Sequence, residues 1–352
     1  MTKARLAVLG VGSWTAVNHL PAIEGRDDIE WVAAVDTDPD RRRNVAARFP
    51  FGLVTGSVDE ALAAGVDAVI VGSTPDAHHD LAKAALEADA HVLCEKPFTT
   101  SSREAWEIVR LAEARGRHLL TAFGWNYTLM VRRAEALLAA HPIGEIEHIQ
   151  IHMATALREM YLKVMPVWGR PEEFLPIPSS YTSLERGAGY NQAQLSHAYG
   201  LALWLTRLRA KRLFAFMSTV GSEVDLHDAV SIEFTNGATG SISGTTCPLG
   251  SNDNKHQLDV RIFGSEGQLL LDFDRELIWL YRDPVNDFRL VVPEGAGAYE
   301  CTGPANALID LALGHDVENR SPGWLAAQAT EMTAAGYDSW RSGRAEDIET
   351  TL

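Results

Sequence analysis

Cysteine is scarce in this chain, whose 352 residues include three cysteines, Cys94, Cys247 and Cys301. Their odd number and wide spacing argue against a disulfide framework, so reduced thiols are expected. No uncharged apolar run approaches the roughly 20 residues that cross a bilayer. The first apolar stretch is only as long as a strand and has no A-x-A-like cleavage site after it, so no signal peptide is expected. These absences predict a soluble, cytoplasmic protein with no membrane partner.

Positive charge is also in short supply. Lys and Arg number 31 against 47 Asp and Glu, which gives a formal net charge of −16. Such an acidic surface repels a phosphate backbone, so nucleic acid is not expected as a partner. Apolar residues make up 46% of the chain, enough for a sizeable core, and the length suits two domains.

The first third of the chain alternates short apolar runs with amphipathic segments. The runs include RLAVLG, IEWVAAVD, DAVIVGS and HVLCEKP, and helix-like segments such as PDAHHDLAKAALEAD separate them. Continuous apolar strands joined by helices predict a parallel sheet with right-handed crossovers. We therefore expect a doubly wound α/β domain, a Rossmann fold, over residues 1–123.

After Gly124 the pattern changes. The strand EIEHIQIHMAT, a long irregular stretch from about 157 to 189 and a helix from about 190 to 208 come first. Alternating strands such as AVSIEFTNG and ATGSISGTT follow, joined by tight turns, and helical segments close the chain. The pattern predicts an α+β domain over residues 124–352, with a large, mostly antiparallel open sheet and helices on one face.

A glycine-rich turn follows the first apolar strand. Gly10 permits a tight turn and Gly12 lets backbone amides approach a pyrophosphate, although Thr15 replaces the third small residue of the usual fingerprint. Asp36 ends the second strand, where a carboxylate accepts the ribose hydroxyls of a dinucleotide. A carboxylate there repels the 2′-phosphate of NADP, so NAD is preferred, while Arg41–Arg43 leave NADP as an alternative.

Two segments resemble metal-binding motifs but lack a feature that each motif requires. The segment Asp36–Asp40 imitates the start of a calcium loop, but Arg41 stands where that loop needs glycine. His78 and His79 are adjacent on a predicted helix, where side chains diverge by about 100° and cannot share one ion. No metal site is therefore predicted.

Glu95, Lys96 and Pro97 follow a predicted strand, at the sheet edge where open α/β folds bind ligands. They belong to a series of short elements: GVGSW at 10–14, Asp36, Thr74-Pro75 followed by His79, CEKP at 94–97, GWNY at 124–127, IGEI at 143–146, and Gly187-Ala188-Gly189 leading to His197. In this order the elements resemble the Gfo/Idh/MocA family of oxidoreductases, the glucose-fructose oxidoreductase and inositol dehydrogenase family. The resemblance covers essentially the whole chain.

The resemblance implies NAD-dependent oxidation of a sugar or cyclitol hydroxyl, or the reverse reduction, with hydride moving to or from nicotinamide C4. It implies that Lys96 contacts the substrate oxygen and that His197 is the catalytic histidine of the second domain. Hydride leaves only as the hydroxyl proton is taken, and histidine suits the base. Lys96 would stabilise negative charge on the oxygen. In this family the open sheet often joins subunits, so a homodimer or homotetramer is expected.

The residues expected to bind the cofactor are Gly10, Gly12, Ser13, Trp14, Asp36, Ser73, Thr74, Pro75, His79, Glu95, Lys96 and Asn126. Those expected to bind the substrate are Lys96, Trp125, Tyr127, Tyr190, Asn191, Gln194 and His197, with His152 and Trp168 as lesser candidates. Aromatic faces beside amides and hydroxyls suit a pyranose or cyclitol ring, and a neutral ring is preferred because no arginine cluster marks a phosphate.

Two positions depart from the family pattern. Ala193 stands where many members have an aspartate four residues before the histidine, and Thr128 stands where many have arginine. Two alternatives to a dehydrogenase therefore stay open. One is a glycosidase or lyase that uses NAD transiently, with Tyr190 or His152 as a further acid or base. The other is a non-catalytic ligand sensor.

Overall fold

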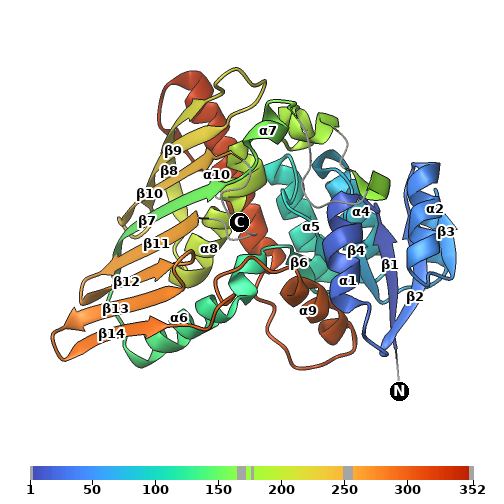
Figure 1. Ribbon diagram of the computed structural model, residues 1–352, viewed down its shortest axis with the longest axis horizontal. Coiled ribbons are helices and arrows are strands. Elements are labelled where there is room, and N and C mark those ends of the chain that lie inside the picture. Colours follow the sequence, from blue (N-terminus) through green and yellow to red (C-terminus); the bar gives the residue numbers. More distant parts are fainter. Residues whose placement is uncertain (1–2, 165–171, 176–177, 249–256, 349–352) are drawn as a thin grey trace.

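A computed structural model of the chain describes residues 3–164, 172–175, 178–248 and 257–348. Two lobes lie side by side, each built on one sheet (Figure 1). Among the described residues, one sheet has six strands and the other has nine. In the same part of the chain, none of the helices combines the length and apolarity needed to span a bilayer.

The first lobe is a parallel sheet flanked by helices. Its strands, in spatial order, are β3 (Leu53–Thr55), β2 (Ile29–Val35), β1 (Ala4–Leu9), β4 (Ala68–Val71), β5 (His91–Cys94) and β6 (Leu119–Thr121). The helices between them are α1 (Leu20–Ile23), α2 (Pro39–Arg48), α3 (Val58–Ala63), α4 (His78–Glu87) and α5 (Ser102–Arg115). The strand order reverses between β1 and β4, and this reversal opens a crevice beyond the strands' carboxyl ends. The predicted Rossmann fold is confirmed.

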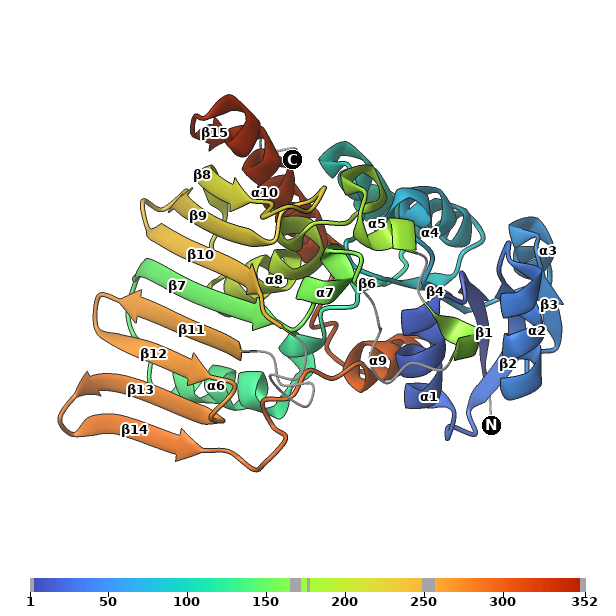
Figure 2. The ribbon, with the colours of Figure 1, turned by 45° about the horizontal axis from the view of Figure 1, so that its top comes forward.

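The second lobe carries the nine-stranded sheet. It contains α6 (Leu129–Ala140), β7 (Ile146–Thr155), α7 (Arg158–Tyr161), α8 (Ser196–Thr206), β8 (Ala210–Ser218), β9 (His227–Phe234), β10 (Thr239–Thr246), β11 (Gln257–Gly264), β12 (Gly267–Asp272), β13 (Leu277–Asp283), β14 (Asn286–Val291) and β15 (Glu346–Asp347). Only β7 and β10 pair in parallel; the other neighbours are antiparallel. Figure 2 shows α6 and α8 behind one face of this sheet, as predicted.

The helix expected from about 190 to 208 begins differently. Its first turn, η7 (Asn191–Leu195), is π-helical and leads directly into α8. A π-helical turn rotates the following side chains relative to a continuous α-helix, and such turns are frequent at functional sites. The catalytic candidate His197 stands just after this irregularity.

The last two helices connect the lobes. The first of them, α9 (Thr302–Ala312), packs against β5 and α1 of the first lobe, although it follows the second sheet in sequence. The second, α10 (Gly323–Ser342), packs against α5 on one side and against α8 and β8 on the other. Together they hold the first lobe against the second.

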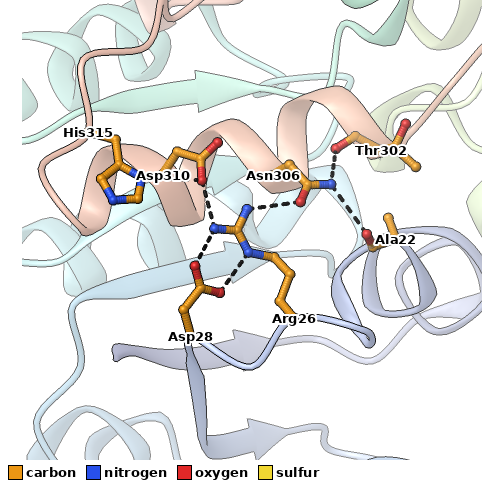
Figure 3. A network of polar contacts seen from close by, with 7 residues as sticks. All are labelled: Ala22, Arg26, Asp28, Thr302, Asn306, Asp310 and His315. Carbon is orange, nitrogen blue, oxygen red and sulfur yellow. Dashed lines mark hydrogen bonds and ion pairs between the residues drawn. The ribbon is translucent and has the colours of Figure 1, made fainter. Parts of the chain in front are cut away.

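A polar network fastens α9 to the first lobe (Figure 3). Arg26 donates to both carboxylate oxygens of Asp28, at 2.8 and 2.7 Å, and to Asp310 on α9 at 2.7 Å. It also donates to Asn306 Oδ1 at 3.0 Å, and the Asn306 amide donates to the Ala22 carbonyl at 3.3 Å. One guanidinium thus satisfies three side chains, Asp28 near it in the chain and Asn306 and Asp310 on α9.

Replacing Arg26 with methionine should lower the free energy of unfolding by about 1–2 kcal/mol, because two partly buried carboxylates lose charge-assisted hydrogen bonds. The hydrogen bond from Arg26 is the main reason that the pKa of Asp28 lies below its ordinary value. This stabilisation is therefore present above the ordinary aspartate pKa of about 4 and is lost as the pH falls through the lower folded value. Urea unfolding at neutral and acid pH measures both effects.

The matched control is Arg43→Met, which removes an exposed ion pair with Asp40 and should leave stability nearly unchanged. Equal stability of wild type and Arg26→Met at neutral pH would show that the network does not fasten α9.

Candidate active site

The carboxyl ends of β1, β2, β4 and β5 open into a cavity of about 420 Å³ between the two lobes. The first lobe contributes wall residues that include Gly10, Gly12, Ser13, Trp14, Asp36, Arg41, Ser73, Thr74, Pro75, Glu95 and Lys96. The second lobe contributes Tyr161, Ser180, Tyr181, Arg186, Gly187, Ala193 and Gln194. The structure therefore brings most of the expected cofactor residues, and two expected substrate residues, Lys96 and Gln194, to one cavity.

The glycine-rich turn has the geometry of a dinucleotide cradle. Gly10 has a φ of +90°, and a Cβ there would lie 2.5 Å from the backbone nitrogen of Ser73. A Cβ on Gly12 would lie 3.0 Å from the Gly72 carbonyl oxygen. Side chains at these positions would press against the turn that follows β4, so the two glycines allow the two backbone turns to meet at the cavity wall, and the residues present fit a dinucleotide.

The incomplete fingerprint has a structural compensation. Thr15 begins a π-helical turn, η1 (Thr15–His19), and its hydroxyl lies 3.4 Å from the Gly72 carbonyl oxygen. A Cβ on Gly72 would overlap the Thr15 hydroxyl. The close packing that usually requires the third glycine of the fingerprint is here permitted by Gly72, which directly follows the neighbouring strand β4.

Asp36 lies at the end of β2 and faces the cavity. Its two carboxylate oxygens accept from the backbone amides of Val11 and Asp38, each at 2.9 Å. Of the three arginines that follow, Arg41 lines the cavity, while Arg42 donates to the Asp36 carbonyl at 2.7 Å. The backbone amides hold the carboxylate in the position expected for contact with the adenosine ribose.

Glu95 and Lys96 follow β5 and differ in environment. Glu95 is buried, and its carboxylate lies 2.5 Å from His19 Nε2 and accepts from the Lys96 amide at 2.9 Å. Burial alone would raise the pKa of Glu95, but the hydrogen bond and charge of His19 outweigh it and hold that pKa below its ordinary value. The Lys96 ammonium donates to the Ala193 carbonyl at 3.1 Å and lies 6.0 Å from the Trp14 ring. Lys96 thus reaches from the first lobe to the second.

His197 lies behind this wall instead of in it. The residue is 4% exposed, and its ring packs edge-on against Phe123 and Tyr299, at centroid distances of 5.8 and 5.2 Å. It stands four residues after Ala193, whose carbonyl accepts from Lys96. The two catalytic candidates therefore meet at the same part of the second lobe.

Several expected site residues are buried in packing away from the cavity wall. Trp125 packs edge-on against Phe273 and Tyr299. The polar members bond to neighbouring chain segments: Asn126 to Arg320 O at 2.9 Å, Tyr127 with Ser321 Oγ at 3.1 Å, Tyr190 to Met153 O at 3.1 Å, and Asn191 to Thr333 O at 3.1 Å. In this structure they support the wall and do not line it.

The structure does not bring His79, an expected cofactor residue, to the cavity wall. His79 lies away from the cavity, 2.8 Å from Asp80 Oδ1 and 3.4 Å from Glu107 Oε2. His78 instead is fully buried, with its ring nitrogens 2.8 Å from the Pro97 carbonyl and 3.1 Å from the Ser73 carbonyl. Burial is the main reason that the pKa of His78 lies below its ordinary value. This histidine joins the turns that follow β4 and β5.

The lesser candidates do not enter the site. His152 lies on the exposed face of the second sheet, 2.9 Å from Ser243 Oγ. Trp168 lies outside the described residues.

Tyr299 is the residue that the sequence analysis missed. Its ring contacts those of Trp14, Trp125 and His197, and its hydroxyl donates to the Ala122 carbonyl at 2.9 Å. Burial raises the pKa of this phenol well above its ordinary value. Tyr299 links the glycine-rich turn to His197, yet it belongs to an irregular segment with no periodicity that could have singled it out.

Comparison with known proteins identifies the family. Residues 4–123 match the model of an oxidoreductase family with an NAD-binding Rossmann fold, and residues 131–270 match the model of the GFO/IDH/MocA C-terminal domain. The chain belongs to the Gfo/Idh/MocA family. The resemblance read from the short elements is thereby confirmed, and this Gfo/Idh/MocA protein is an NAD-binding oxidoreductase.

Individual relatives are distant. An uncharacterized oxidoreductase of Synechocystis sp. is 27% identical over 323 residues, covering 86% of this chain and 81% of that protein. Inositol 2-dehydrogenase of Arthrobacter sp. is 30% identical over 145 residues, covering 40% of this chain and 43% of that enzyme. A solved structure of levoglucosan dehydrogenase with NADH and L-sorbose has a TM-score of 0.78 at 19% identity, covering 99% and 100% of the two chains. The structural likeness shows that this Gfo/Idh/MocA protein shares the fold of that enzyme.

Proposed function

We propose that this Gfo/Idh/MocA protein is an NAD-dependent dehydrogenase that oxidises a secondary hydroxyl of a sugar or cyclitol, or reduces the corresponding ketone. The observation that carries the proposal is the position of Lys96. Its ammonium shares one cavity with the glycine-rich turn and donates to a backbone carbonyl of the second lobe. A cation thus stands where the dinucleotide lobe meets the second lobe.

Each residue then has a chemical task. Gly10, Gly12 and Asp36 would hold NAD, whose nicotinamide ring supplies the hydride acceptor. Lys96 stabilises the negative charge that develops on the substrate oxygen as the hydride leaves. His197 takes the hydroxyl proton, a role supported by its position four residues after the carbonyl that Lys96 contacts.

A neutral polyhydroxylated ring suits the second-lobe wall. That wall presents hydroxyl and amide side chains from Tyr161, Ser180, Tyr181 and Gln194. Among the described residues, the buried Tyr161 hydroxyl has no hydrogen-bond partner, and a substrate hydroxyl would satisfy it. Relatives named as acting on inositol or binding L-sorbose support the same substrate class.

The experiment is a screen of cofactor-stripped protein with NAD or NADP against neutral sugars, cyclitols and their phosphates, read by nicotinamide absorbance. We expect reduction of NAD with a neutral ring polyol. If the protein binds NAD but nicotinamide absorbance changes with none of the compounds, the proposal is contradicted.

Asp36→Asn should weaken NADH binding and lower the preference for NADH over NADPH by about 10-fold or more, because the repelled 2′-phosphate no longer faces a negative charge. The preference for NAD is itself part of the proposal. Dissociation constants of both nucleotides, measured by fluorescence, give the ratio. Asp40→Asn on the exposed face of α2 is the control, and an unaltered ratio in Asp36→Asn would show that the ribose lies elsewhere.

We also propose a homodimer or homotetramer joined through the open sheet. Phe216, which is 69% exposed, packs against Phe214 on the outer face of β8. An exposed aromatic pair on an open sheet favours a covering partner. A monomer in sedimentation analysis would contradict this part of the proposal.

The alternative of transient redox chemistry requires a further acid or base. Its two candidates, Tyr190 and His152, lie in the packing of the second lobe and on its outer face. The Tyr190 hydroxyl already donates to the Met153 carbonyl, and His152 lies on the outer face of the sheet, so neither supports a second proton transfer and we favour net oxidation or reduction.

A further inference from the structure

Residues 172–175 and 178–187, which follow α7 in the chain, lie against the first lobe, and we call them the strap. Asn44 on α2 donates to the Glu173 carbonyl at 3.0 Å, and Arg41 donates to the Leu175 carbonyl at 3.0 Å. Phe174 is 3% exposed and packs within the core of the first lobe. The short 3-10 turn Glu172–Phe174 packs against α2. The strap is therefore anchored at the end of the cavity marked by Asp36.

The strap has a second anchor across the cavity. Gly187 has a φ of +87°, and a Cβ there would overlap the ring of Pro75 in the turn after β4. The preceding residue, Arg186, lies 3.4 Å from the Thr74 hydroxyl through Nη2 and 3.4 Å from Asp76 Oδ2 through Nε. The strap thus contacts the first lobe on both sides of the cavity that it lines.

Arg186 stands beside the glycine-rich turn. A Cβ on Gly10 would touch the Ser73 backbone, and Arg186 contacts the next residue, Thr74, while lining the same cavity. In doubly wound folds the diphosphate of a dinucleotide lies against the turn after the first strand. A planar guanidinium with several donors matches phosphate oxygens in geometry and charge.

We propose that Arg186 binds the diphosphate of NAD from the second lobe and that the strap closes over the bound dinucleotide. Asp76 then competes with the diphosphate for the same guanidinium. The inference rests on the NAD site and is independent of the substrate that the protein oxidises.

The test measures binding of NADH, ADP and adenosine to the full chain. Arg186→Met should weaken NADH and ADP by about 10-fold or more, the scale of one lost charge-assisted contact, and should leave adenosine unchanged. Arg186→Lys should recover part of the loss, because the charge returns without the fork of donors. Lys163→Met is the control, since Lys163 lies before the strap and pairs with Glu223 at 3.1 Å.

A second variant is expected to act in the opposite direction. Asp76→Asn removes a negative charge beside Arg186 and should tighten ADP and NADH several-fold. In the double variant with Arg186→Met most of this gain should disappear, because the competition no longer exists.

Undiminished ADP binding in Arg186→Met would overturn the proposal, as would equal losses of ADP and adenosine, which would mean that Arg186 only supports the packing. Wild-type protein that binds NADH but oxidises no polyol would refute the proposed dehydrogenase and leave the role of Arg186 standing.

Discussion

Replacement of Lys96 with methionine is expected to lower turnover by about 10²-fold or more, the scale on which a lost stabiliser of a developing oxyanion acts. Methionine preserves much of the length of the side chain and removes the charge. The Lys96 side chain lines the cavity and is not part of either hydrophobic core, so the fold should survive. NADH affinity should change far less than turnover, because the glycine-rich turn and Asp36 remain.

Steady-state kinetics on the polyol found by the screen, together with NADH binding, separates these effects. Lys83→Met is the matched control, because Lys83 pairs with Glu107 on the surface, 2.7 Å away. If Lys96→Met turns over as fast as the wild type, Lys96 does not stabilise the reacting oxygen.

Replacement of His197 with glutamine is expected to lower turnover by about 10²-fold, the usual contribution of a general base. Glutamine retains a polar side chain in the space between Phe123 and Tyr299, whereas alanine would leave a cavity there. The wild-type rate should fall at acid pH as the base becomes protonated, and the variant should lose this limb of its pH profile.

The loss of the acid limb distinguishes a base from a packing residue, which would change rate without changing the shape of the profile. His152→Gln serves as the control, because His152 lies on the exposed face of the second sheet. If His197→Gln turns over as fast as the wild type and keeps the same pH profile, His197 is not the base.

The fold followed from local pattern, because continuous apolar runs and alternating runs have different burial requirements. In DAVIVGS consecutive residues are apolar, which predicts a strand buried on both faces of its sheet. In AVSIEFTNG apolar and polar residues alternate, which predicts a strand with one buried face. The partner of α9 could not be predicted in this way. Its periodicity shows that one face is apolar, but only tertiary contacts such as the Arg26 network decide that this face packs on the first lobe.

The site followed from the sequence where backbone geometry restricts residue type. Gly10 needs a positive φ and Lys96 follows a strand at the carboxyl edge, so both reach the cavity as expected. Aromatic residues carry no such restriction, because Tyr127 and Tyr190 suit a protein core as well as a sugar ring. The structure uses them for packing.

The position of His79 away from the cavity has a geometric cause. Because α4 begins at His78, neighbouring positions on it differ by about 100° in direction, and only one can point at the ends of β4 and β5. The position of Arg186 at the cavity could not be predicted from the sequence, for a different reason. Arg186 belongs to a long irregular stretch, whose contacts with α2 and Pro75 leave no periodic trace in the sequence.

The central claim is net hydride transfer, and the most direct measurement is the ratio of NADH formed to polyol consumed. Wild-type protein is incubated with NAD and the panel, the reduced nicotinamide is read by absorbance, and each polyol is quantified by chromatography. We predict one NADH for each polyol consumed, with both signals strongly reduced in Lys96→Met. Consumption of a sugar without accumulation of NADH would contradict net oxidation and indicate transient redox chemistry.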